Sequence, residues 1–94
     1  MADNAFEWDD RKAVANFAKH AVSFDAARAV FNDPFAVDRL EDRTDYGEER
    51  FVIIGMVDGR LLFVAYTMRG DIIRIISARG AEPREQRQYY EDQN

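Results

Sequence analysis

The chain of 94 residues has no cysteine, one histidine and two prolines. Without cysteine it has no disulfide framework and no thiolate metal site, which fits a protein of the reducing cytoplasm. A single histidine is also too few for a structural zinc site, and we expect no metal. The longest apolar run, residues 51–57, is too short to cross a bilayer. The first residues are acidic where a signal peptide needs a basic region, so we expect a soluble cytoplasmic protein.

A strong positive charge is also missing, because the formal net charge is −5 at pH 7. A nonspecific nucleic-acid binder would be basic. The charge is uneven, however: residues 1–49 hold twelve Asp/Glu and six Lys/Arg, whereas residues 50–94 hold six and seven. The cations that could meet RNA are therefore mostly arginines of the second half. The acidic first half is either a surface for a basic partner or simply solvated.

The length predicts a single domain over residues 1–94. Hydrophobic periodicity predicts two helices in its first half. Asp9 is placed to cap a helix that ends near residue 20, and Ser23 to cap a helix over residues 24–32. The apolar residues on one face of the first helix, which we expect to point into the core, are Val14, Phe17, Ala18 and Ala21.

Five short segments have the composition of strands: residues 5–8, 35–40, 50–57, 60–68 and 72–78. Asp58-Gly59 is a strong hairpin signal, and residues 42–48 are predicted to form a polar loop. Pro83 is suited to begin a last helix that runs through Tyr90. The order β-α-α-β-β-β-β-α predicts an α+β domain, with two N-terminal helices packed on an antiparallel sheet and a C-terminal helix.

Three arginines gather on the last two predicted strands: Arg69, Arg74 and Arg79. Arginine is costly to bury unless it meets a carboxylate or an anion. The sequence leaves both possibilities open. The arginines could form a local phosphate site, or Arg74 could pair with a neighbouring carboxylate such as Glu49, and Arg69 could be an exposed turn residue.

Several blocks of the sequence resemble one known family: residues 6–9, 16–24, 30–34, 48–51, 66–70 and 74–79. Over residues 6–91 the chain is similar to the BrnT toxins of bacterial type II toxin–antitoxin modules. Two positions depart from the family pattern. Ala21 stands where glycine is usual, and Gln86 stands where arginine is usual.

The resemblance implies a RelE-like fold and a ribonuclease that inhibits translation. It further implies neutralisation by a BrnA-like antitoxin, a small DNA-binding protein of the ribbon-helix-helix type. The complex would repress its own promoter, so that operator DNA is reached only through the antitoxin. No cofactor is expected, and RNA cleavage is expected to be metal-independent.

Cleavage of this kind deprotonates the 2′-hydroxyl, protonates the leaving 5′-oxygen and stabilises charge on the phosphorane. Guanidinium suits the last task, so Arg69, Arg74 and Arg79 are expected to hold the phosphate. His20 is a candidate acid or base, or only a favourable charge at a helix end. Glu48 or Glu49 is a candidate base, or surface charge. The residues expected to contact RNA are Lys12, Lys19, Arg84, Arg87 and Tyr89.

These RNA-contact residues have simpler roles as alternatives, since lysines are often solvated and a tyrosine can anchor a helix that is poor in aliphatic residues. A different function also remains open. The chain could be a binding module whose catalytic site has decayed, retained for antitoxin binding and promoter control. Its acidic charge and Gln86 favour this hypothesis, whereas the intact arginine series opposes it.

Overall fold

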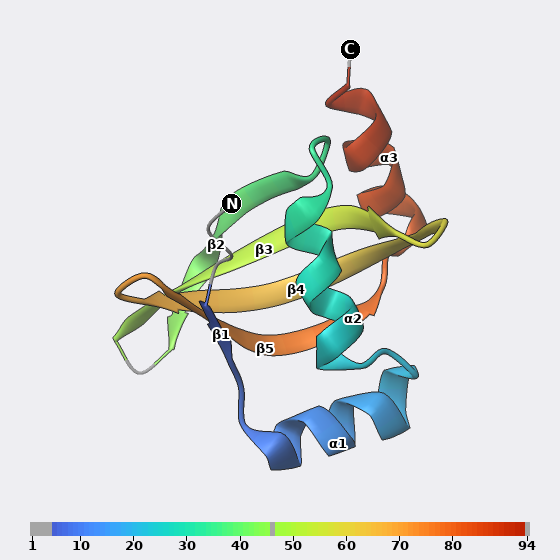
Figure 1. Ribbon diagram of the computed structural model, residues 1–94. Helices are drawn as coiled ribbons and strands as arrows, with labels where there is room; N and C mark the ends of the chain where they lie inside the picture. Colours follow the sequence, from blue (N-terminus) through green and yellow to red (C-terminus); the bar gives the residue numbers. More distant parts are fainter. Residues whose placement is uncertain (1–4, 46, 94) are drawn as a thin grey trace.

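A computed structural model describes residues 5–45 and 47–93, with the backbone alone over residues 42–45 (Figure 1). The elements in these residues are β1 (Ala5–Glu7), α1 (Asp10–His20), α2 (Phe24–Arg28), the 3₁₀-helix η1 (Ala29–Asn32), β2 (Val37–Asp45), β3 (Glu48–Val57), β4 (Arg60–Arg69), β5 (Ile72–Gly80) and α3 (Pro83–Glu91). The predicted α+β class is confirmed. No helix of the described part is long and apolar enough to cross a membrane.

The strands form one sheet in the order β1-β5-β4-β3-β2. Neighbouring strands are antiparallel except at one edge, where β1 runs parallel to β5 and Glu7 lies opposite Arg74. The prediction of a wholly antiparallel sheet is therefore wrong. It failed because a three-residue strand carries no sequence signal for the direction of its pairing.

Of the two predicted connections between β2, β3 and β4, one is confirmed and the other is shorter than predicted. Asp58 and Gly59 have positive φ values of 50° and 79°, which confirms the predicted hairpin between β3 and β4. The predicted loop over residues 42–48 is wrong in its extent, since β2 continues to Asp45 and β3 already begins at Glu48. A short turn that includes Gly47 at φ 79° joins them, and residue 46 lies outside the described residues.

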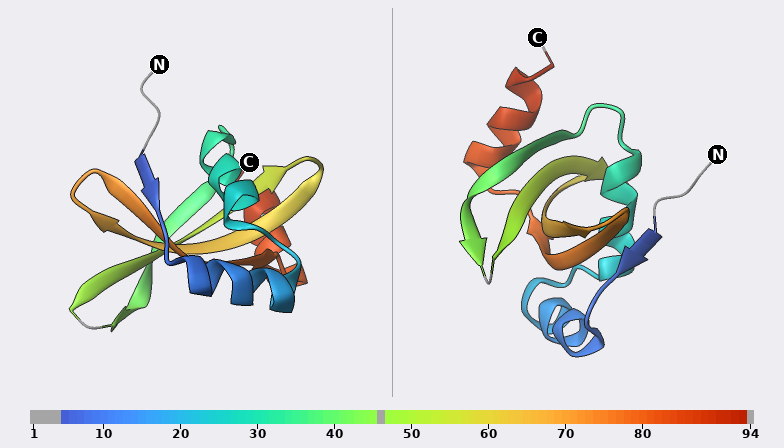
Figure 2. Two further views of the ribbon diagram at one scale, coloured as in Figure 1. Left: turned by 60° about the horizontal axis from the view of Figure 1, so that its bottom comes forward. Right: turned by 90° about the vertical axis from the view of Figure 1, so that its left-hand side faces the viewer.

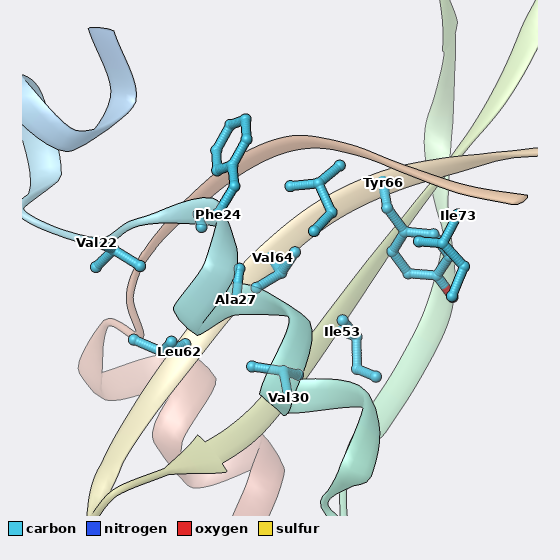
Figure 3. Packing of buried hydrophobic residues seen from close by; sticks show 11 residues of the cluster. Val22, Phe24, Ala27, Val30, Ile53, Leu62, Val64, Tyr66 and Ile73 are labelled. Carbon is cyan, nitrogen blue, oxygen red and sulfur yellow. The ribbon is translucent and has the colours of Figure 1, made fainter. Parts of the chain in front are cut away.

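Helices cover the two faces of the sheet at different places. In Figure 1, α2 and η1 cross one face, and Figure 2 shows α3 on the opposite side of the curved sheet. The main core lies under α2 and η1 (Figure 3). Its buried residues are Val22, Phe24, Ala27, Val30, Ile53, Leu62, Val64, Tyr66, Ile73, Ile75 and Ala78.

The predicted helix over residues 24–32 is divided, because α2 ends at Arg28 and continues as the tighter η1. This tight turn packs closely against β3. A Cβ atom added at Gly55 would lie 2.8 Å from Cγ1 of Val30. Glycine at this position thus permits the close approach of helix and sheet.

A bulge in β5 decides which of its side chains share a face. Tyr66 pairs with Ile75 and Ala65 pairs with Ser77, so Ile76 is an extra residue in β5. In a regular strand, residues five apart point to opposite faces. The extra residue brings Arg74 and Arg79 to the same face, away from α2, while Ile75 and Ala78 both remain in the main core.

The predicted inward face of α1 is wrong. Val14 is 71% exposed and Phe17 is 56% exposed, whereas Asn16 is buried. The side-chain amide of Asn16 donates to the carbonyls of Val22 (3.0 Å) and Ala78 (2.8 Å), and its oxygen accepts from the Ala78 N–H (3.1 Å). Because β1 ends opposite Arg74, the outer edge of β5 at Ala78 needs another partner, and Asn16 supplies it.

The Asp33 carboxylate connects α3 to β3 through hydrogen bonds. Its Oδ2 accepts from the Tyr89 hydroxyl (2.7 Å) and the Met56 N–H (2.8 Å), and its Oδ1 accepts from the Phe35 N–H (2.9 Å). Burial would raise the pKa of Asp33, but these hydrogen bonds outweigh it and hold the pKa below its ordinary value. Burial, together with the neighbouring carboxylate, raises the pKa of Tyr89 to about 12.

We predict that Asn16→Ala lowers the free energy of unfolding by about 2–3 kcal/mol, because the buried N–H and C=O of Ala78 lose their partner. Lys19→Ala, an exposed change on the same helix, should stay within about 0.5 kcal/mol of wild type. Urea unfolding followed by circular dichroism measures both. Equal stability of Asn16→Ala and wild type would contradict the role assigned to this amide.

Asp33 should also make stability depend on pH. Because its pKa is lower in the folded state, the carboxylate stabilises the fold above the ordinary aspartate pKa, and this contribution disappears as pH falls through the folded value. Asp33→Asn should therefore be less stable than wild type at pH 7, and the gap should shrink below about pH 4. Urea midpoints at pH 7, 5 and 3 test this, and a gap that widens in acid is the opposite result.

Candidate functional site

A hollow of about 300 Å³ opens on the sheet face that carries Arg74. It lies near the β4–β5 turn, which is at the opposite end of the sheet from α3 (Figure 1). The residues that line it come from α1, β3, β4 and β5: Lys12, Glu48, Glu49, Arg50, Thr67, Arg69, Arg74 and Ile76. Four cations and two carboxylates thus surround one open space, which we call the arginine hollow.

Carboxylates form ion pairs with the guanidinium groups of Arg69 and Arg74 at the hollow. Nη1 of Arg74 lies 2.8 Å from Oε2 of Glu7, and Nη1 of Arg69 lies 3.7 Å from the same oxygen. Nε of Arg69 donates to Glu48 at 2.9 Å, which holds the pKa of Glu48 below its ordinary value. Arg74 does pair with a carboxylate of a neighbouring strand, which was one of its two possible roles. The partner is Glu7 and not the suggested Glu49, because parallel pairing of β1 with β5 places Glu7 opposite Arg74.

These ion pairs remain accessible to solvent. The side chains of Arg69 and Arg74 are 49% and 26% exposed, and that of Glu7 is 34% exposed. Exposed ion pairs contribute little to stability because water screens them. A phosphate group, which offers two oxygens to a guanidinium fork, can therefore compete with the carboxylates for these arginines.

Arg79 is held differently. Its Nη1 and Nη2 bond to the two carboxylate oxygens of Glu85 at 2.8 and 2.9 Å, and its guanidinium lies 4.3 Å from the centre of the Phe63 ring. Glu85 is only 5% exposed. Arg79 also lies five residues along β5 from Arg74, about 15 Å in a strand. It does not line the arginine hollow, and its guanidinium joins α3 to the sheet.

The other predicted site residues are dispersed, apart from Lys12. His20 lies two turns beyond Lys12 on α1, about 12 Å along the helix axis, and does not line the hollow. Lys19 is exposed on α1 and Arg84 and Arg87 are exposed on α3, whereas Tyr89 is buried with its hydroxyl on Asp33. The functional assignments of these residues stay predictions.

The hollow also contains residues that the sequence did not single out. Arg50 and Thr67 line it from β3 and β4, and Glu7 reaches its arginines from β1. Strand alternation could have placed Arg50 with Val52 and Thr67 with Ala65, but no signal pointed to Glu7. Within residues 5–45 and 47–93, no group of three or more His, Cys, Asp or Glu is arranged to hold a metal ion.

One known family matches most of the chain. A family profile described as "Ribonuclease toxin, BrnT, of type II toxin-antitoxin system" matches residues 8–85. The chain belongs to this BrnT family. The match spans every residue that lines the arginine hollow, from Lys12 to Ile76, and ends at Glu85 near the start of α3. No curated protein matches the chain.

Because Arg74 and Arg79 have different carboxylate partners, we predict that their replacement by alanine changes the stability of the fold to different extents. Arg79→Ala should lower the free energy of unfolding by about 3 kcal/mol, because it leaves the buried Glu85 carboxylate unpaired. Arg74→Ala should cost less than about 1 kcal/mol, since its partner Glu7 is 34% exposed and remains hydrated without it. Urea unfolding of the two variants provides the comparison. A larger loss in Arg74→Ala than in Arg79→Ala would contradict this division of roles.

Proposed function

We propose that the chain is a metal-independent endoribonuclease that cleaves single-stranded RNA in the arginine hollow and so inhibits translation. The observation that carries this proposal is the convergence of Lys12, Arg69 and Arg74 on one open space from three separate elements. Family membership supports the ribonuclease class. The guanidinium and ammonium groups supply the positive charge that a phosphorane needs, without a metal ion.

Phosphate binding would begin by exchange of partners. A phosphodiester that enters the hollow takes the place of Glu7 and Glu48 on the guanidinium groups of Arg69 and Arg74. Because these pairs are partly exposed to solvent, their loss costs little, and the phosphate gains charge-assisted hydrogen bonds. The arginines are then positioned to stabilise the additional charge of the transition state.

The same exchange releases a candidate base. Glu48 is held ionised by Arg69, whose hydrogen bond lowers the pKa of the carboxylate. When the phosphate takes over Arg69, the Glu48 carboxylate becomes free to accept the proton of the 2′-hydroxyl. The hydroxyl oxygen then attacks phosphorus, the bond to the 5′-oxygen breaks, and the ammonium of Lys12 or water protonates that oxygen. The products are a cyclic phosphate and a 5′-hydroxyl end.

The finer family features form part of the same proposal. The helices α1 and α2 beside a curved sheet are compatible with a RelE-like fold, and the protein would act in the cytoplasm. Its partner would be a BrnA-like antitoxin of the ribbon-helix-helix type, which binds operator DNA for the complex. The supporting observation is membership of a type II toxin–antitoxin family.

One observation favours the alternative of a binding module with a decayed site. Arg69 and Arg74 are paired with carboxylates, and Arg79 is bound to the buried Glu85. In this case the hollow would contribute to partner binding or to the fold, and the purified protein would not cut RNA. A cleavage assay separates the two functions.

We predict that Arg69→Ala and Arg74→Ala each slow cleavage of a single-stranded RNA pool by roughly a hundredfold or more, because each removes charge next to the reacting phosphate. Glu48→Gln should slow cleavage by at least a comparable factor, since an amide cannot accept the proton. Excess EDTA should leave the wild-type rate unchanged. Gel analysis of 5′-labelled RNA measures these rates.

Arg11→Ala is the matched control, because Arg11 is exposed on α1 and does not line the hollow. Its rate should equal that of wild type. His20→Ala should also remain active if proton transfer depends on the hollow alone. Absence of cleavage by the wild-type protein, or full activity of Arg74→Ala, would overturn the proposal.

A further inference from the structure

An apolar surface on α1 has no partner within the described residues. Val14 and Phe17, one turn apart, are 71% and 56% exposed because Asn16 occupies the inward side of the helix. Large apolar side chains that gather on the surface of a small protein often mark a site of protein association. The outer face of α1 is therefore the strongest candidate for an interaction surface that the nuclease proposal does not use.

Phe17 lines two depressions in the surface. On one side a slot of about 330 Å³ runs between α1 and α2, lined by Trp8, Ala13, Val14, Phe17, Ser23, Phe24 and Asp25. On the other side a depression of about 260 Å³ reaches the core residue Leu62, and the charged residues that line it are Asp58 and Arg60. An apolar side chain of a partner can enter the slot and contact Trp8 and Phe24, as in the helix-in-groove mode of recognition.

The charge around the slot indicates the chemistry of its occupant. Asp25 is the charged residue that lines it, and its side chain is 76% exposed despite an ion pair with Arg28 at 3.3 Å. Asp10 lies one helical turn before Val14 on the same face. Carboxylates that flank an apolar slot favour a segment with an apolar stripe bordered by lysine or arginine.

We propose that this surface, defined by Val14, Phe17 and the slot between α1 and α2, binds a basic amphipathic segment of the antitoxin. The inference rests on family membership for the existence of an antitoxin, and on the proposed function for its BrnA-like character. It does not depend on RNA cleavage, because Val14 and Phe17 do not line the arginine hollow. Lys12 lies on the opposite side of α1, so the two surfaces can be tested separately.

The test measures the affinity of the full-length protein for the purified antitoxin of its own toxin–antitoxin module, by isothermal titration calorimetry. Val14→Asp/Phe17→Asp should weaken binding at least about 30-fold, because it places charge in the apolar contact. Asp25→Lys should weaken binding several-fold, and the loss should diminish at high salt. RNA cleavage without antitoxin should be unchanged in both variants.

Leu40→Asp is the matched control, because Leu40 is as exposed as Phe17, at 56%, but lies on β2. It should bind antitoxin like wild type. Unchanged affinity of Val14→Asp/Phe17→Asp, or an equal loss in Leu40→Asp, would overturn the proposal. So would a dimer of the free protein that Val14→Asp/Phe17→Asp dissociates, since the occupant would then be a second copy. Selective loss of antitoxin binding by a protein that never cuts RNA would support the docking surface and refute the nuclease.

Discussion

The bulge at Ile76 is the constraint on which the arrangement of the candidate site depends. It allows β5 to give Ile73, Ile75 and Ala78 to the core while Arg74 and Arg79 share the opposite face. At the end of this face near the β4–β5 turn, Arg74 remains beside an open hollow, whereas at the other end α3 covers the face and Glu85 binds Arg79. Two arginines that look equivalent in the sequence thus have different environments.

The environments also explain why charges of both signs meet at the hollow. Arginines in the sheet of a small protein need partners, and Glu7 and Glu48 provide them while the pairs stay partly exposed to solvent. Such partners keep Arg69 and Arg74 in place at little cost, and under the proposed function they are exchanged for the phosphate of RNA. By contrast, a buried partner such as Glu85 holds its arginine more firmly, because loss of the pair would leave a buried carboxylate without a counter-charge.

Local chemistry made much of the fold predictable from sequence. Asp9 and Ser23 do cap helices, and Asp58-Gly59 does form the hairpin turn. Hydrophobic periodicity predicted the wrong buried face of α1. A count of apolar residues does not show that the edge of β5 beyond β1 needs the amide of Asn16 as a hydrogen-bond partner.

The candidate site was predictable only in part. The convergence of Arg69 and Arg74 could have been predicted, since a short turn joins their strands. The pairing of Arg79 with Glu85 and the approach of Glu7 to Arg74 depend on a bulge and a parallel pairing that sequence does not reveal.

The central claim is that Arg69 and Arg74 exchange their carboxylates for the phosphate of RNA. The most direct test is the ¹H–¹⁵N spectrum of the arginine Nε–H groups during titration with a short RNA whose 2′-hydroxyls are replaced by hydrogen, so that it binds without being cut. We expect saturable shifts of the Arg69 and Arg74 signals and an unmoved Arg79 signal. Signals of Arg69 and Arg74 that stay fixed while the RNA binds elsewhere would contradict the account.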